Sequence, residues 1–201
     1  MTAKRIYSIG HSTLPIEQFL GLLGEHGVRL VADIRRFPAS RRYPWFARQA
    51  LQQAVEAAGL EYRWLAQLGG YRGALRPDSP HLGLRVAGFR NYADYMATAE
   101  FHAAAGELMG LAESWPAAYM CAERLYWRCH RMLLSDFLVV RGWEVVHILE
   151  PGKTVRHKLT QGAVVEAGQL LYLPGGVARR RAAPSWPGYG RGRPPYLWWP
   201  R

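Results

Sequence analysis

The chain has 201 residues, of which 26 are Lys or Arg and 15 are Asp or Glu, so its formal net charge is +11 and its isoelectric point is near 10.1. This balance favours polyanionic partners but indicates no particular fold. Hydrophobic residues make up 49% of the chain, which excludes global disorder and suits one folded domain. Neither a membrane span nor the apolar core of a signal peptide is present, so we expect a cytoplasmic protein with no membrane contact.

Short apolar runs alternate with amphipathic segments along most of the chain. The predicted strands are residues 4–9, 29–34, 61–65, 117–121 and 144–149, with a sixth short strand at 169–173. The predicted helices are residues 14–26, 44–58, 89–113 with a break near Thr98, and 129–141, and residues 69–88 are predicted to be a long loop. Apolar strands that alternate with helices are typical of a mostly parallel sheet with helices on both faces, so the predicted class is α/β.

Residues 178–201 differ in composition from the α/β domain predicted for residues 1–177. They contain six Arg, five Pro and no acidic residue, and they carry +6 of the net charge. Because Arg binds phosphates and aromatic rings stack on bases, this extension suits a strand of nucleic acid. Alternatively, its aromatic residues pack onto the domain itself. The candidate nucleic-acid-binding residues here are Arg179, Arg180, Arg181, Arg191, Arg193, Trp198 and Trp199.

Polar residues follow the predicted strands at the ends where a parallel sheet builds its sites. Because five segments would bring such residues to one edge, we expect them to form a common site. The candidates are His11 and Ser12 after the first strand, Asp33 and Arg35 at the end of the second, Gly69, Gly70, Tyr71 and Arg72 after the third, Cys121 and Glu123 after the fourth, Cys129, His130 and Arg131 at the start of the next helix, and His147 on the fifth strand. Ser12 has a second interpretation, as the N-cap of the helix that follows it.

The segment Cys121–Arg131 is the richest in reactive groups. At the start of a helix, unpaired N–H groups and the helix dipole would stabilise a Cys129 thiolate. Glu123 is either a general base or an ion-pair partner of Arg131. The alternative for Cys121 and Cys129 is that both are small buried hydrophobic residues.

A zinc ion needs three or four converging ligands, and the available set is Cys121, Cys129, His130 and either His147 or His11. Neighbouring residues on a helix point about 100° apart, which would separate the Cys129 and His130 side chains. We therefore expect no metal and no other cofactor.

Basic and aromatic residues alternate between residues 35 and 48. Arg41, Arg42 and Arg48 are candidate nucleic-acid-binding residues in this cluster. A solvated approach to a helix, with its aromatic residues packed inward, would have the same pattern.

Two further pairs of residues have two interpretations each. Asp33 and Arg35 form either a buried ion pair or an acid–base group with a phosphate clamp. Tyr92 and Tyr95 lie on a predicted helix whose apolar face favours the core, but their hydroxyl groups are suited to bind a substrate.

Seven short motifs occur in order along the chain: Ile9–Ser12, Asp33–Arg35 with Pro38 and Ser40, Leu68–Arg72, Tyr92–Met96, Met120–Glu123, Cys129–Arg131 and Val146–Ile148. In these motifs the chain resembles the domain-of-unknown-function family 488 (DUF488) over about residues 5–150. The resemblance implies an α/β domain whose polar motifs gather in one pocket. It implies no reaction, and it does not extend to residues 178–201.

Three functions are open at this point. In the first, the protein is an enzyme that acts on DNA or RNA without a metal, for example by hydrolysing the glycosidic bond of a flipped-out base. The roles in that reaction are water activation by Asp33 or Glu123, phosphate binding by Arg35 and Arg131, and stacking on the base by Tyr71 or Tyr92. In the second, Cys121 or Cys129 attacks a small electrophile with His130 or His11 as its base. In the third, the protein binds nucleic acid without catalysis.

Overall fold

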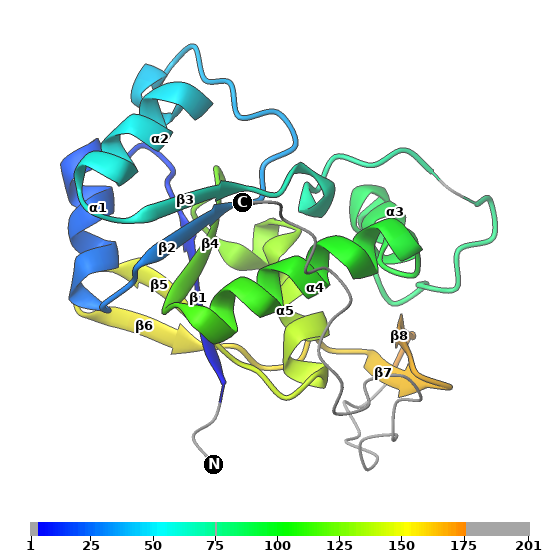
Figure 1. The fold of residues 1–201 in the computed structure, drawn as a ribbon. Helices are drawn as coiled ribbons and strands as arrows, with labels where there is room; N and C mark the ends of the chain where they lie inside the picture. Colours follow the sequence, from blue (N-terminus) through cyan, green and yellow to red (C-terminus); the bar gives the residue numbers. More distant parts are fainter. Residues whose placement is uncertain (1–3, 75, 176–201) are drawn as a thin grey trace, which may run out of the picture.

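The structure is a computed structural model that describes residues 4–74 and 76–175. Six strands form one sheet in the order β3-β2-β4-β1-β5-β6 (Figure 1). Strands β1 to β5 run parallel, and β6 pairs antiparallel with β5. Their bounds are β1 (Arg5–Gly10), β2 (Leu30–Asp33), β3 (Glu61–Trp64), β4 (Ala117–Cys121), β5 (Glu144–Glu150) and β6 (Lys153–Arg156). The prediction of a mostly parallel sheet is confirmed.

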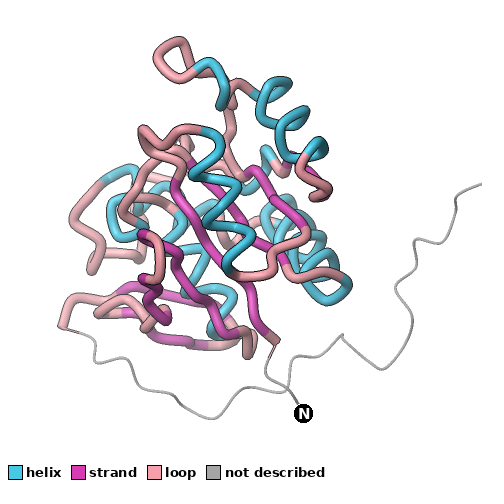
Figure 2. The backbone as a smooth tube through the Cα atoms, turned by 90° about the vertical axis from the view of Figure 1, so that its left-hand side faces the viewer, coloured by secondary structure: helices cyan, strands magenta, loops and turns pink. Residues whose placement is uncertain are grey.

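Helices cover both faces of this sheet (Figure 2). One face holds α1 (Ile16–Glu25) and α2 (Arg48–Ala57), and the other holds α3 (Ala87–Tyr95), α4 (Ala99–Ser114) and α5 (Arg131–Val140). Each face has its own hydrophobic core. Along β4, Ala118 and Met120 pack in the core beneath α1 and α2, whereas Ala117 and Tyr119 pack in the core beneath α3, α4 and α5. Because successive strand residues point to opposite faces, a sheet covered on both sides needs apolar side chains throughout. The predicted α/β class is confirmed.

The helices differ from the prediction mainly where they begin. The predicted break is present at Thr98, whose hydroxyl group accepts a hydrogen bond from the Phe101 N–H and caps α4. Short 3-10 turns over Pro44–Phe46 and Tyr126–Arg128 precede α2 and α5. As a result, Cys129 lies before α5 and does not begin it.

The predicted sixth strand is present but belongs to another sheet. β8 (Gln169–Tyr172) pairs with β7 (Ala163–Glu166) in a two-stranded hairpin. The hairpin is attached to α5 through Asp136, which accepts hydrogen bonds from the Tyr172 hydroxyl group at 3.0 Å and the Thr160 N–H at 2.8 Å. The sixth strand of the main sheet is β6, which the sequence analysis did not predict because all four of its residues are exposed and carry no apolar pattern.

Within residues 4–74 and 76–175, no helix is long and apolar enough to cross a membrane. Within the domain predicted for residues 1–177, the described residues build the six-stranded sheet with a hydrophobic core on each face and the β7–β8 hairpin. Residues 178–201, and with them the seven nucleic-acid-binding candidates of the C-terminal extension, lie outside the described residues.

The strand order creates a crevice between β1 and β4. These strands are neighbours in the sheet, yet α1 follows β1 on one face and α5 follows β4 on the other face. The two connections therefore part at the carboxyl ends of the strands, where open α/β sheets bind their ligands.

Candidate functional site

An open cleft of about 1030 Å³ lies at the carboxyl ends of β1 and β4. It draws its lining from the segments after β1, β2, β3 and β4 and from the residues just before α5. Of the candidate residues, those that line it are His11, Ser12, Arg35, Arg41, Arg42, Gly70, Tyr71, Cys121, Glu123, Cys129 and His130. Residues from distant parts of the sequence thus meet at one edge of the sheet.

Backbone pairing continues past the end of β1 into the floor of the cleft. The N–H of His11 donates to the Cys121 carbonyl at 3.0 Å, and the N–H of Ser12 donates to the Ala122 carbonyl at 2.9 Å. Ser12 has a positive φ of 48°. It does not cap α1, whose N-cap is Pro15, so the interpretation of Ser12 as an N-cap is wrong.

Asp33 lies behind the cleft, where it fixes Arg35. Its carboxylate is fully buried and accepts hydrogen bonds from Arg35 Nε at 2.8 Å and Nη2 at 2.6 Å. The Tyr62 hydroxyl group donates to the same carboxylate at 2.8 Å. With both oxygens bound and no access to the cleft, Asp33 positions Arg35 and has no path to a substrate water molecule.

His11 is held as a neutral imidazole. Its Nδ1 lies 3.0 Å from the Ser12 carbonyl, and its Nε2 lies 3.3 Å from Arg35 Nη1. This pattern assigns the proton to Nδ1, because the guanidinium can only donate to Nε2. Burial, and the charge of Arg35, lower the pKa of His11 to about 4. A base whose lone pair accepts from Arg35 is poorly suited to take up a proton at neutral pH.

Cys121, Cys129 and His130 form a compact cluster at the cleft. One ligand atom from each lies within 4.8 Å of the others, and Cys129 Sγ is 3.5 Å from His130 Nδ1. Cys129 has an extended backbone (φ −129°, ψ 150°) and His130 is the N-cap of α5. The helical geometry that separated these side chains in the sequence analysis is therefore absent, and that argument against a metal site is wrong.

The two thiols interact with each other. A hydrogen bond from Cys121 lowers the pKa of Cys129 well below its usual range, and the nearby His130 and Arg131 lower it further. The same hydrogen bond and burial raise the pKa of Cys121. The pair is thus arranged to carry a thiolate on Cys129.

The two glycines after β3 let their loop approach the cleft floor closely. A Cβ atom on Gly70 would overlap the imidazole ring of His130, and one on Gly69 would overlap the backbone of Arg36. Any larger side chain at either position must displace a neighbour. The loop therefore needs glycine at these positions because neighbouring atoms leave no room for a Cβ, and not because the backbone adopts a positive φ.

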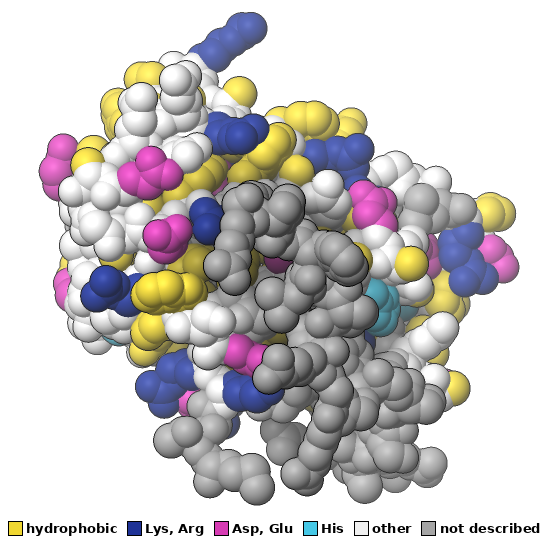
Figure 3. Space-filling view, in the orientation of Figure 1, with side chains coloured by type: hydrophobic (Ala, Val, Ile, Leu, Met, Phe, Trp, Pro, Cys, Tyr) yellow, Lys and Arg dark blue, Asp and Glu magenta, His cyan; other side chains and the backbone are white. Residues whose placement is uncertain are grey.

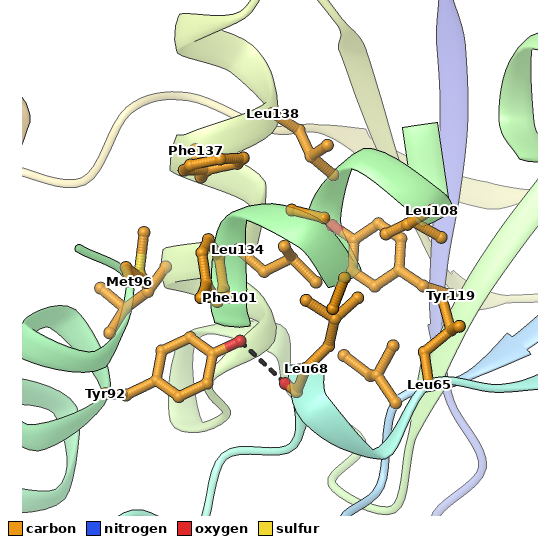
Figure 4. Close-up of a cluster of buried hydrophobic side chains, with 14 of the residues drawn as sticks. Leu65, Leu68, Tyr92, Met96, Phe101, Leu108, Tyr119, Leu134, Phe137 and Leu138 are labelled. Carbon is orange, nitrogen blue, oxygen red and sulfur yellow. Dashed lines mark hydrogen bonds between the residues drawn. The ribbon is translucent and has the colours of Figure 1, made fainter. Parts of the chain in front are cut away.

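Tyr92, Tyr95 and Arg72 support this loop from behind. The Tyr92 hydroxyl group donates to the Leu68 carbonyl at 2.8 Å, as Figure 4 shows within the buried cluster. The Tyr95 hydroxyl group donates to the Gln67 carbonyl at 2.8 Å, and the Arg72 guanidinium lies 3.6 Å from the centre of the Tyr95 ring. None of the three lines the cleft, so the structure gives them a supporting role in place of substrate contact.

Arg131 and His147 are also buried away from the cleft. Arg131 is 1% exposed and donates to Ser8 Oγ and to the carbonyls of Glu123 and Arg124. His147 is fully buried, stacks on Tyr126, and lies 2.9 Å from a nitrogen of His157. Arg131 therefore holds the loop after β4 and does not reach a phosphate in the cleft.

Exposed basic and aromatic side chains surround the mouth of the cleft. Phe37 and Tyr71 are 68% and 78% exposed, with ring centres 6.2 Å apart. Besides the buried Arg35, five exposed arginines line the same cleft, namely Arg36, Arg41, Arg42, Arg124 and Arg128. The candidate Arg48 lies elsewhere, over the Trp64 ring at 4.1 Å.

Arg124 and Arg128 are not among the candidate residues predicted from the sequence, although both lie in the Cys121–Arg131 segment that is richest in reactive groups. On the face drawn in Figure 3, basic side chains are scattered among acidic ones. The net charge of the chain therefore gives little indication of where the cleft lies. The arginines come together around the cleft because the fold brings their segments to one edge of the sheet.

A family model described as "Domain of unknown function DUF488" matches residues 15–138, which is more than half of the chain. The protein belongs to the DUF488 family. No match to a curated protein or to a solved structure was found. The matched span contains Gly70, Cys121, Cys129 and His130, whereas His11 lies before it. The DUF488 span and the strand β1 outside it thus contribute jointly to the cleft.

Substituting Gly70 tests the close approach of its loop to His130. We expect Gly70→Ala to lower the free energy of unfolding of this DUF488 protein by about 1–3 kcal/mol, because the added methyl group overpacks the imidazole ring. Gly73→Ala is the matched control, since no atom of the described part of the chain lies within 4 Å of a Cβ there. Urea denaturation measures both, and equal stability of the two variants would contradict the assignment.

Because burial lowers the pKa of His11, we expect the folding stability of the protein to depend on pH. The unfolded chain takes up this proton near pH 6.5 and the folded protein near pH 4, so between these values the unfolded state binds more protons. Stability is lost as pH falls through this window, by up to about 1.4 kcal/mol per pH unit from this group. His11→Gln should reduce that slope in urea denaturation at pH 7 and 4.5. Parallel pH profiles of the two proteins would rule out a depressed pKa.

Proposed function

We propose that this DUF488 protein is an enzyme that binds a strand of DNA or RNA across the cleft and hydrolyses a bond at a base inserted into it. The glycosidic bond of that base is the bond we favour. The observation that carries the proposal is the exposed ring pair of Phe37 and Tyr71 beside five arginines, above a floor of reactive groups.

The mouth of the cleft has the groups that a single strand requires. Aromatic faces stack on bases whatever their sequence, and guanidinium groups bind the phosphates. Arg36 donates to the Tyr71 carbonyl at 3.0 Å and lies 5.7 Å from the centre of the Phe37 ring, so it fixes both aromatic residues next to the basic rim. Arg41, Arg42 and Arg128 are exposed and make no ion pair with a carboxylate of the described residues.

Glu123 is the group we assign to water activation. Its side chain is exposed and lines the cleft, and its carboxylate accepts a hydrogen bond from the Leu125 N–H at 3.2 Å. Asp33 lacks access, and His11 is neutral with its lone pair engaged. Glu123 is thus the carboxylate placed to take a proton from a water molecule beside a bound base.

The proposal extends to two features beyond the cleft itself. The arginines and tryptophans of residues 178–201 would lengthen the binding surface for the strand. A cytoplasmic location would keep Cys121 and Cys129 as the free thiols that they are here.

The lowered pKa of Cys129, together with His130 Nδ1 at 3.5 Å, favours a second candidate function. In it, the Cys129 thiolate attacks an electrophilic small molecule in the same cleft. Replacing both cysteines with serine would abolish that activity, whereas a fully active double variant would eliminate it.

Neutralising the rim tests the binding part of the proposal. We expect the triple variant Arg41→Gln/Arg42→Gln/Arg128→Gln to bind a fluorescent single-stranded oligonucleotide more weakly. Its plot of log affinity against log salt should be less steep by about 0.7 for each phosphate that the variant no longer neutralises. The matched control is Arg29→Gln, which removes an exposed arginine just before β2, at the opposite edge of the sheet. Equal affinities and slopes for the two variants would contradict a nucleic-acid-binding cleft.

Glu123→Gln tests the catalytic part. Turnover of oligonucleotides that carry damaged bases should fall by about 10²–10⁴-fold, because proton transfer from water is lost while the hydrogen bond from Leu125 is kept. Oligonucleotide affinity should stay unchanged. Full turnover in this variant would exclude Glu123, and a wild-type protein that binds strands but converts none would be a binding module.

A further inference from the structure

The cluster of Cys121, Cys129 and His130 has the composition and the size of a zinc site. Zinc binds thiolates at about 2.3 Å and imidazole nitrogen at about 2.1 Å, so tetrahedral coordination separates a sulfur from a nitrogen by about 3.6 Å. Cys129 Sγ and His130 Nδ1 are 3.5 Å apart. The three ligand atoms all lie within 4.8 Å of one another, so a small contraction would bring each to bonding distance of one ion.

The buried guanidinium of Arg131 favours anionic groups in its surroundings. Arg131 is 1% exposed, and its hydrogen bonds go to neutral oxygens, those of Ser8 Oγ and of two carbonyl groups. A buried cation without a nearby negative charge is strongly unfavourable. Cys121 and Cys129 both interact electrostatically with this guanidinium, and as thiolate ligands of a metal ion they would place negative charge near it.

The His130 ring is available to a metal. Its Nδ1 contacts only the Cys129 sulfur among hydrogen-bond partners, and its Nε2 is buried with no partner in the described residues. Gly70 packs against the ring from one side, and the Tyr92 ring lies 5.1 Å away. The ring is therefore held by packing, and among the residues that the structure describes no nitrogen or oxygen donor competes for the lone pair on Nδ1.

We propose that Cys121, Cys129 and His130 bind one zinc ion whose fourth coordination position opens into the cleft. All three residues line the cleft, whereas a purely structural zinc site is closed by a fourth protein ligand. Glu123 lines the same cleft but does not belong to the ligand cluster, which leaves the fourth position to water or substrate. Zinc binding displaces the remaining thiol proton to solvent.

This inference stands on the ligand geometry and does not depend on the nature of the substrate. It replaces the expectation of a metal-independent site, which rested on a helical position of Cys129. A water molecule on the open position would be more acidic than bulk water, and Glu123 lines the cleft into which that position opens.

Metal content tests the proposal without any nucleic acid. The full-length protein, reduced and reconstituted with zinc and then desalted, should hold about one zinc ion per chain by mass spectrometry of the metal. Cys121→Ser, Cys129→Ser and His130→Asn should each lose most of it. Glu123→Gln and His26→Gln are the controls that should retain it, the second because His26 lies at the end of α1 away from the cleft.

Cobalt gives a second readout on the wild-type protein itself. Added to the wild-type protein, Co²⁺ should produce the strong near-ultraviolet absorption of sulfur-to-cobalt charge transfer and the visible bands of tetrahedral cobalt, and zinc should remove both. The proposal is overturned if the wild-type protein binds no more zinc than the Cys121→Ser/Cys129→Ser variant, or if its cobalt spectrum lacks charge transfer. Either result would leave nucleic-acid binding at the rim untouched, so the two proposals fail separately.

Discussion

The floor of the cleft depends on the buried guanidinium of Arg131. From α5 it reaches Ser8 on β1 and the carbonyls of Glu123 and Arg124 after β4, so one side chain joins the three segments that meet at the switch point of the sheet. The guanidinium serves these acceptors from two separate nitrogens, Nη1 and Nη2, whereas a lysine would offer its donors from a single nitrogen. Gly10 has to be small for the same reason, because a Cβ there would overlap the Glu123 carbonyl and the guanidinium itself.

The floor and the rim of the cleft are built differently. The floor residues His11 and Cys121 lie at or next to the last residues of β1 and β4, and backbone pairing between them continues the sheet. Arg35 is fixed by Asp33, which is itself the last residue of β2. The rim residues Phe37 and Tyr71 belong to longer connections and expose most of their surface. Short connections to a rigid sheet hold reacting groups in place, whereas loops adapt to a partner.

The sequence predicted the elements whose apolar pattern is local, and it failed where the outcome depended on distant contacts. Strand β4 was predicted to the residue, because both of its faces are buried and Pro116 precedes it. Strand β6 was missed because its side chains are exposed and only pairing with β5 makes it a strand. The roles of Arg131 could not be predicted, since Ser8 is 123 positions away in the chain. Helix α5 begins two residues later than predicted, within the usual uncertainty of a helix boundary, and this shift brings the Cys129 and His130 side chains together.

For the proposed nucleic-acid substrate, the distribution of charge favours one orientation in the cleft. Glu123 exposes its carboxylate in the cleft, so a phosphate group placed beside it would be repelled. The arginines lie around the mouth, where a phosphate is attracted and remains hydrated. A strand that satisfies both conditions keeps its backbone at the rim and directs an uncharged group, the base, toward the floor. In the proposed zinc site, an ion bound by two thiolates would be close to neutral as a unit. Glu123 would remain the negative charge beside it, and the ion would add a Lewis acid beside the base. The same electrostatics therefore favour chemistry on a base over cleavage of the phosphate backbone.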